Sequence, residues 1–185
     1  MCYPIINIHK GGHTMYYISY GSNMNIAQMA YRCPNTKIYG NAKIYGWKLV
    51  FNYHADIIET GNKDDFVPVV IWKLDNEMDK YSLDRYEGYP SYYTKRKITA
   101  VMDKTGKEVK AMVYVMADRR KGIYPPSVEY FNGIKEGYIA NRIDVEPLYN
   151  AIRECCDKRN ITEYNQYNPK PLDVAEYIGK GEWVI

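Results

Sequence analysis

Short runs of β-forming residues, broken up by glycines, limit most strongly the folds that this chain can adopt. The runs cover residues 16–20, 38–53, 67–74, 92–102 and 109–116. Gly40 and Gly46 divide the second run, where they allow bends or close backbone contacts in a curved sheet. Pro68 is expected to interrupt the third run, because proline cannot donate a ladder hydrogen bond. Many short strands with bending glycines favour a curved or closed sheet over a doubly wound one.

Helices are predicted between and after these strands from their start signals. The signals are Ser22, Asn23 or Asn25 for the first helix, Asp75 or Asn76 for the second, Ser127 for the third and a position near Asp144 for the fourth. The second helix is expected to end near Tyr86, before the stop residue Gly88. A short helical patch is also predicted over residues 173–178, and residues 103–106 are predicted to join the last two strands as a hairpin turn. This order of elements places the fold in the α+β class.

The length of 185 residues fits a single domain, and no internal repeat or linker divides the chain. Met15 begins the first convincing strand, so residues 1–14 are predicted to be an N-terminal extension whose order is left open. This extension has no apolar h-region, so we do not expect it to act as a secretion signal. Residues 15–185 are predicted to form the domain, with a helical C-terminal part.

Charge and hydropathy argue against two classes of partner. The formal net charge is only +3, and the longest cationic run, residues 119–121, is interpreted as a solvated loop. No segment has the apolar length that a membrane helix needs. We therefore expect neither nucleic-acid binding nor membrane insertion.

The cysteine pattern indicates free thiols in a reducing compartment. Two of the four cysteines, Cys155 and Cys156, are adjacent, which suits neither a disulfide scaffold nor a paired C-x-x-C metal site. The three histidines lack the spacing of zinc ligands. We expect a cytoplasmic protein that uses no metal and no other cofactor.

The turn Tyr20-Gly21-Ser22-Asn23 is the first candidate for chemistry. It links a predicted strand to a predicted helix, so several backbone N–H groups meet at one point beside a glycine that lets a ligand approach. Such a turn can bind a carboxylate or the oxyanion that forms when a carbonyl is attacked. The four residues by themselves also fit an ordinary strand-to-helix connection. Ser22 is not expected to be a nucleophile, because no Gly-x-Ser-x-Gly elbow surrounds it.

Glu87 is the second candidate, because it lies at the C-terminal end of the predicted second helix. The helix dipole disfavours a carboxylate there by about 0.3–1 kcal/mol. A raised carboxyl pKa is what a general base working near neutral pH requires. The alternative is a solvated glutamate at a frayed helix end. Asp84, one turn earlier, is expected on the helix surface or in a local ion pair with Arg85.

Three segments together resemble the γ-glutamylcyclotransferases, including AIG2-like proteins. The run Tyr17-Ile18-Ser19-Tyr20-Gly21-Ser22-Asn23-Met24 is similar to their signature turn, in which Leu usually stands at the place of Met24. The run Leu83-Asp84-Arg85-Tyr86-Glu87-Gly88 resembles their catalytic Leu-Asp-x-x-Glu-Gly motif. The run Pro125-Pro126-Ser127-Val128-Glu129-Tyr130 resembles a third element, whose final Tyr contacts substrate. The likeness covers roughly residues 16–151, and Pro68 falls where the family often has Gly.

This resemblance implies a small, curved or closed mixed β-barrel with flanking helices, and it implies roles for particular residues. Glu87 would be the catalytic general acid and base. Substrate would be bound by Tyr17, Ile18, Ser19, Tyr20, Gly21, Ser22, Asn23 and Tyr130.

The implied substrate is a small γ-glutamyl amide, which would cyclise to 5-oxoproline and release an amine or amino acid. Two alternatives stay open. The chain could deprotect a γ-glutamylated biosynthetic intermediate, or it could be a non-catalytic binding domain of the same fold. The sequence indicates neither the leaving amine nor the oligomeric state.

Overall fold

The structure is a computed structural model that describes residues 14–159. The helical patch predicted over 173–178 and all but the last residue of the predicted N-terminal extension lie outside the described residues. The strands are β1 (Met15–Ser19), β2 (Lys37–Tyr45), β3 (Trp47–Asn52), β4 (His54–Glu59), β5 (Phe66–Leu74), β6 (Tyr93–Met102) and β7 (Glu108–Met116). The helices are α1 (Ile26–Arg32), α2 (Glu77–Tyr86), α3 (Val128–Ala140) and α4 (Glu146–Arg159), with short 3-10 turns η1 (Ser22–Met24) and η2 (Asp118–Arg120).

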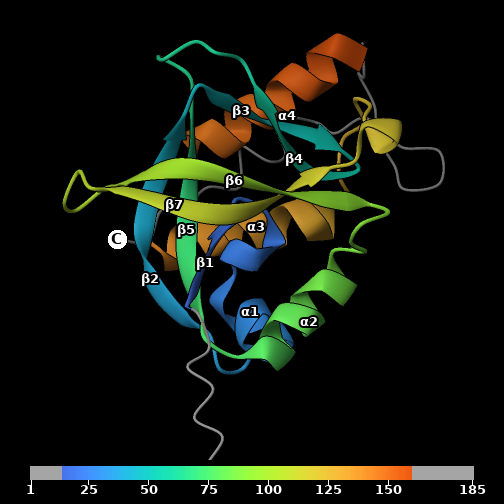
Figure 1. Cartoon of the computed structure of the whole chain (residues 1–185). Coiled ribbons are helices and arrows are strands. Elements are labelled where there is room, and N and C mark those ends of the chain that lie inside the picture. Colours follow the sequence, from blue (N-terminus) through green and yellow to red (C-terminus); the bar gives the residue numbers. More distant parts are fainter. Residues whose placement is uncertain (1–13, 160–185) are drawn as a thin grey trace, which may run out of the picture.

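Five of the strands close into a barrel in the order β1-β5-β2-β6-β7 (Figure 1). The barrel is mixed, because β1 pairs antiparallel with β5 and parallel with β7. The remaining strands, β3 and β4, form a separate antiparallel hairpin. The predictions of the α+β class and of a closed mixed barrel with flanking helices are confirmed.

Gly40 marks the place where β2 bends. The register between β2 and β5 shifts between Ile38 and Gly40, and the Gly40 φ angle is 156°. A Cβ at this position would lie 2.8 Å from the Met102 side chain, so a larger residue would crowd the neighbouring strand. The predicted role of this glycine in a curved sheet agrees with the bulge.

Two details of the strands differ from expectation. Pro68 does not interrupt β5, which runs without a break from Phe66 and pairs Pro68 with Lys43. The reason is that β1 pairs only with residues 70–74 of β5, so Pro68 lies where β5 has β2 as its one barrel partner. Strand β4 was not predicted, because its sequence His-Ala-Asp-Ile-Ile-Glu carries polar residues that hide the strand pattern.

Side-chain caps define the beginnings of three helices. Asn25, Asn76 and Ser127 accept hydrogen bonds from the backbone amides of Gln28, Met78 and Tyr130, at 3.1, 2.8 and 3.2 Å. These caps satisfy amides that the first helical turn leaves free. No helix among residues 14–159 is long and apolar enough to cross a membrane.

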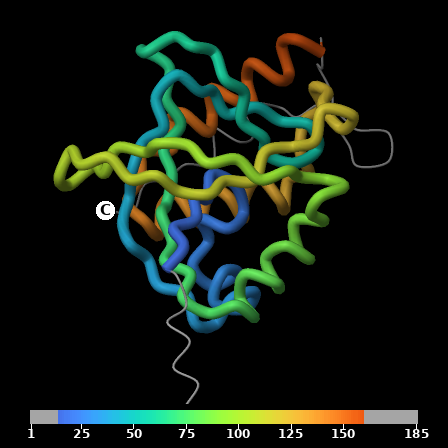
Figure 2. The backbone as a smooth tube through the Cα atoms, in the orientation of Figure 1, coloured from blue at the N-terminus to red at the C-terminus, as the bar shows by residue number. Residues whose placement is uncertain are grey.

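The helices cover different parts of the barrel. Figure 2 shows α1 and α2 next to each other, on the opposite side of the barrel from α4. Helix α4 packs on β3, and α3 packs against η1 at the end of β1. The largest fully buried side chains come from the barrel strands, η1 and the helices alike, and include Ile18, Met24, Ile71, Leu83, Phe131 and Tyr138. The core therefore joins the barrel to its helices, and it fixes the start of α1, the end of α2 and the start of α3 relative to one another.

Candidate active site

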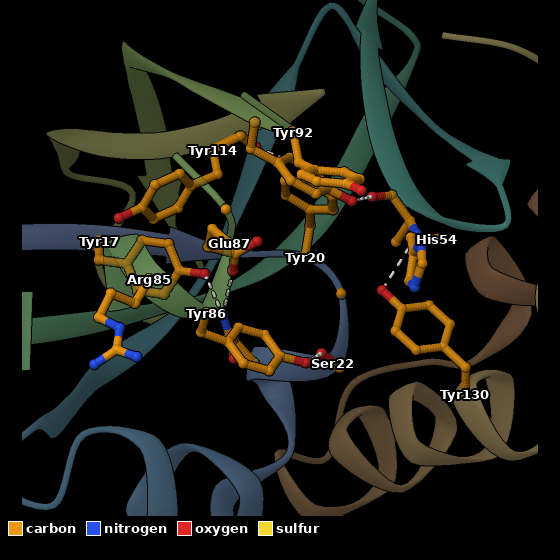
Figure 3. A pocket seen from close by; sticks show the side chains of 15 residues that line it. Tyr17, Tyr20, Ser22, His54, Arg85, Tyr86, Glu87, Tyr92, Tyr114 and Tyr130 are labelled. Carbon is orange, nitrogen blue, oxygen red and sulfur yellow. Dashed lines mark hydrogen bonds between the residues drawn. The ribbon is translucent and has the colours of Figure 1, made fainter. Parts of the chain in front are cut away.

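A cavity of about 460 Å³ opens at the end of β1 (Figure 3). Its lining comes from segments far apart in the sequence: β1 and η1, the start of β4, the end of α2, β6, β7 and α3. Seven of the lining residues are tyrosines: Tyr17, Tyr20, Tyr86, Tyr92, Tyr93, Tyr114 and Tyr130. The other lining residues are Gly21, Ser22, Asn23, His54, Ala55, Arg85, Glu87 and Gly88. Among the described residues, the cavity therefore combines aromatic walls with one carboxylate, that of Glu87.

The floor of this cavity is the turn after β1. The amides of Met24 and Asn25 donate to the carbonyls of Gly21 and Ser22, at 2.9 and 3.1 Å. The amides at the start of such a 3-10 turn precede its first internal hydrogen bond and so have no partner within it. A Cβ at Gly21 would lie 3.2 Å from the Ala55 Cβ and 3.4 Å from the Tyr130 hydroxyl. The glycine therefore keeps open the approach to amides that can bind an anion.

Glu87 reaches this turn from the far end of α2. It is the C-cap of that helix, its amide donates to the Leu83 carbonyl at 2.9 Å, and Gly88 leaves the helix with a φ of 61°. The Asn23 side-chain amide donates to Glu87 Oε1 at 2.7 Å. Two segments that lie 64 residues apart in the sequence thus meet through one hydrogen bond, and Figure 3 shows Glu87 at the centre of the cavity.

Burial raises the pKa of the Glu87 carboxyl to about 7. Asp84 raises this pKa further, whereas Arg32 and hydrogen bonds from Asn23 and Tyr17 lower it. A raised pKa was expected from the helix dipole, but the main cause is the loss of water around the carboxylate. Near neutral pH this carboxyl can both accept and return a proton.

The phenol of Tyr17 completes the surroundings of Asn23. The Asn23 side-chain nitrogen donates to the Tyr17 hydroxyl oxygen at 2.8 Å, in addition to its bond with Glu87. Burial raises the pKa of Tyr17 well above its ordinary value, and the charge of Glu87 raises it further. The phenol of Tyr17 therefore keeps its proton.

Tyr130 lies across the cavity from Tyr17. Its hydroxyl accepts a hydrogen bond from the Ala55 amide at 3.2 Å, and its ring meets the His54 ring edge-on with 5.0 Å between centroids. Tyr93 donates to the Ala55 carbonyl at 2.9 Å. The two tyrosine hydroxyls thus bind the backbone amide and carbonyl of Ala55, and β4 forms the cavity wall opposite Glu87. Burial lowers the pKa of His54, so its ring is neutral near pH 7.

Of the nine residues predicted for the site, all but Ile18 and Ser19 line the cavity. Ile18 is fully buried in the core. The Ser19 hydroxyl donates to the Val70 carbonyl at 3.2 Å and accepts from the Trp72 indole at 2.9 Å. The side chains of these two residues therefore serve the packing of β1 against β5.

Sequence reasoning missed the parts of the site that β4, β6, β7 and α1 provide. Arg32 contacts Asn23, and Tyr93 and Tyr114 line the cavity. The high tyrosine content, 21 of 185 residues, was a signal that some phenols line a polar pocket. It did not indicate which tyrosines do so.

The expected ion pair between Asp84 and Arg85 is wrong. Asp84 accepts from Lys95 at 2.7 Å and from the Tyr114 hydroxyl, so it faces the barrel. The guanidinium carbon of Arg85 lies 5.9 Å from the Tyr81 ring centroid, and Arg85 lines the cavity. The physical reason is that adjacent helical residues do not face each other.

No group of three or more His, Cys, Asp or Glu side chains in residues 14–159 could hold a metal ion.

Comparisons with known proteins agree on one family. A family model described as "Gamma-glutamyl cyclotransferase, AIG2-like" matches residues 17–132. The chain is 30% identical to the gamma-glutamylcyclotransferase of Bos taurus over 185 residues, which span 94% of this chain and 92% of that protein. It is 28% identical to the gamma-glutamylcyclotransferase of Homo sapiens over 177 residues, or 90% and 88% of the two chains. A solved structure titled "Gamma-glutamyl cyclotransferase" superimposes with a TM-score of 0.64 at 25% identity, and the match covers 91% of this chain and 99% of that one.

Proposed function

The chain belongs to the gamma-glutamyl cyclotransferase, AIG2-like family, and on this premise we propose that it is a γ-glutamylcyclotransferase. It converts the γ-glutamyl group of a small γ-glutamyl amide into 5-oxoproline and releases the amine or amino acid. The observation that carries the proposal is Glu87, the one carboxylate that residues 14–159 bring to the cavity, hydrogen-bonded to the turn whose amides can bind an oxyanion.

The proposed reaction begins with proton transfer to Glu87. The carboxylate takes a proton from the α-ammonium group of the substrate, and the freed amine attacks the γ-carbonyl carbon of the same molecule. A C–N bond forms, the five-membered ring closes, and negative charge develops on the carbonyl oxygen. The amides of Gly21, Ser22 and Asn23 stabilise this oxyanion, since donors fixed in advance cost no reorganisation during the reaction.

Collapse of the intermediate breaks the original amide bond. The ring nitrogen loses two protons over the reaction and the leaving nitrogen gains two, and Glu87 carries them one at a time. A carboxyl with a pKa of about 7 suits both directions of this transfer.

Nucleophile and electrophile belong to one molecule, so the protein has little chemistry to supply besides orientation. Well-oriented intramolecular reactions reach effective molarities of about 10⁵–10⁸ M. The aromatic walls of the cavity can hold the substrate in the bent conformation that ring closure needs. Tyr130 and Tyr17, on opposite sides of Glu87, are proposed to define this conformation.

Glu87→Gln tests the proposal, because the amide keeps the shape of the side chain but cannot accept the proton. We expect the variant to fold and to lose at least about a hundredfold in turnover, the lower range for general acid–base catalysis. The measurement is mass-spectrometric detection of 5-oxoproline after incubation with a panel of γ-glutamyl dipeptides.

Glu77→Gln is the matched control, since Glu77 is an exposed carboxylate at the other end of the same helix. This control should retain wild-type turnover. Near-normal turnover in Glu87→Gln would contradict the role of Glu87. A wild-type protein that forms no 5-oxoproline from any substrate of the panel would instead be a binding module.

A cytoplasmic location is proposed as well. The three cysteines in the described part of the chain, Cys33, Cys155 and Cys156, are buried free thiols, as expected in a reducing compartment. Fractionation of cells with an antibody against the chain tests this location, and recovery in a secreted or membrane fraction would contradict it.

A further inference from the structure

Arg32, the last residue of α1, lies directly behind the site described above. Its guanidinium donates to Asn23 Oδ1 at 2.5 Å, to Ser22 Oγ at 3.3 Å and to Gln28 Oε1 at 2.7 Å. The guanidinium carbon also lies 3.7 Å from the centroid of the Tyr86 ring. One planar group thus contacts the turn, its own helix and the end of α2, and such a forked contact restricts its orientation.

Asn23 connects this guanidinium to the carboxylate. Its side-chain oxygen accepts from Arg32, while its nitrogen donates to Glu87 Oε1 at 2.7 Å and to the Tyr17 hydroxyl at 2.8 Å. Asn23 is only 3% exposed, so these bonds do not compete with bulk water. Both N–H donors and one of the two acceptor positions of this amide are therefore used, and its plane is fixed by Arg32 on one side and by Glu87 on the other.

We propose that Arg32 is a positioning residue of the reaction: through Asn23 it holds the Glu87 carboxylate in the orientation from which it exchanges protons with the substrate. This inference rests on the proposed function of Glu87. Arg32 does not line the cavity, so it acts on the reaction through Asn23 and through its charge.

The other groups that face Glu87 do not replace this cation. From neighbouring elements these are the thiol of Cys33 and the phenols of Tyr17, Tyr20, Tyr93, Tyr114 and Tyr130. Burial raises the pKa of each of them, so they stay neutral near pH 7. On α2 itself, Asp84 pairs with Lys95 at 2.7 Å and its charge raises the pKa of Glu87, opposite to the effect of Arg32. Arg85 lines the cavity, and its guanidinium carbon lies 5.9 Å from the centroid of the Tyr81 ring.

Arg32→Met removes both the charge and the hydrogen bonds and keeps a similar apolar stem. We expect turnover to fall about ten- to a hundredfold, since a small misplacement of a reacting group has effects of this size. KM should change much less, because Arg32 does not touch the substrate. Arg32 lowers the pKa of Glu87, so its loss should move the Glu87 titration to higher pH.

Two measurements test this expectation. The titration of the Glu87 carboxyl is followed by carbon NMR, with its resonance identified by its loss in Glu87→Gln. The acid limb of kcat/KM is measured on the same samples. Both midpoints should move together in Arg32→Met, and neither should move in Arg153→Met, a matched control that removes a partly exposed arginine from α4.

A double-mutant cycle separates positioning from general loss of structure. If Arg32 acts through Asn23, Arg32→Met should cost much less turnover in an Asn23→Ala background than in the wild type. Equal losses in both backgrounds would overturn the proposal, as would an unchanged Glu87 titration in a folded Arg32→Met protein.

If Arg32→Met does not fold, Arg32→Lys takes its place. Lysine keeps the positive charge but not the planar, forked guanidinium, so turnover should fall while the Glu87 titration moves little. Wild-type turnover in Arg32→Lys would overturn the proposal. If the wild-type protein makes no 5-oxoproline, the proposed function is wrong. The NMR titration still shows in that case whether Arg32 affects the titration of the Glu87 carboxyl.

Discussion

Asn23 does more at the site than its place in a turn indicates. The sequence suggests a residue whose backbone N–H faces an anion, yet the side chain joins Glu87, Tyr17 and Arg32 through hydrogen bonds of 2.7, 2.8 and 2.5 Å. Glu87 is consequently a carboxylate that is removed from water but still held by donors. Removal from water is the stronger effect, since its pKa is raised to about 7.

The pH dependence of the reaction should report this pKa. Only the deprotonated form of Glu87 can accept the substrate's proton, so kcat/KM should fall about tenfold per pH unit below a midpoint near 7. A rate profile from pH 5 to 9 with one γ-glutamyl dipeptide measures it. A profile that stays flat down to pH 5 would mean that Glu87 keeps an ordinary pKa or is not the base.

At the scale of elements, the site depends on how closely α3 approaches the turn. At Gly137 an added Cβ would lie 2.7 Å from the Asn25 nitrogen and 2.8 Å from the Met24 carbonyl carbon. At Gly133, one turn earlier, the nearest atom would be the end of the flexible Gln28 side chain at 3.0 Å. An added methyl group would therefore meet rigid backbone at Gly137 but a flexible side chain at Gly133.

Alanine at these two positions should have different effects on stability. Gly137→Ala should lower the free energy of unfolding by about 1–3 kcal/mol, because a rigid backbone must move to admit the methyl group. Gly133→Ala should leave it unchanged or raise it by up to about 1 kcal/mol, because alanine favours the helix and Gln28 can move. Urea unfolding of both variants measures the difference. A loss in Gly133→Ala as large as that in Gly137→Ala would contradict the close approach of α3 to η1.

At the scale of the whole molecule, the buried carboxylate opposes folding above neutral pH. The folded-state pKa of Glu87, about 7, lies above the ordinary value of 4.5, so the folded protein prefers the protonated form. The contribution of Glu87 to stability is therefore fully present below pH 4.5 and is lost as the pH rises through 7.

Glu87→Gln should consequently be more stable than the wild type at pH 8. The difference in free energy of unfolding should be small at pH 5 and grow by up to about 3 kcal/mol by pH 8, the value that follows from the two pKa values. Chemical denaturation at several pH values measures it, with Glu77→Gln as the baseline for an exposed carboxylate on the same helix. A difference that does not depend on pH would contradict the raised pKa.

Local signals account for what could be predicted of the fold. Asn76 and Ser127 begin their helices as expected, and Gly88 ends α2 with a positive φ angle, because caps and stops depend on neighbouring residues alone. Strand β4 was missed because its pairing with β3 and the bond from Asp56 to the Met116 amide, at 2.8 Å, are contacts across the fold. Pro68 in β5 was misjudged for the same reason, since only the barrel decides how many partners a strand has at each residue.

The sequence by itself determined the α+β class, the motifs at 17–24, 83–88 and 125–130, and the identity of Glu87 as the candidate base, because these depend on residue types and their order. Only the tertiary structure decided what surrounds that carboxylate. Packing of the helices and of the β3–β4 hairpin on the barrel brings Asn23 and Arg32 to one side of Glu87 and the wall formed by β4 and Tyr130 to the other, and the barrel makes Ile18 and Ser19 packing residues. The physical reason is that burial and hydrogen-bond partners are properties of contacts between distant segments. The pKa of Glu87 therefore follows from the fold, whereas its position follows from the sequence.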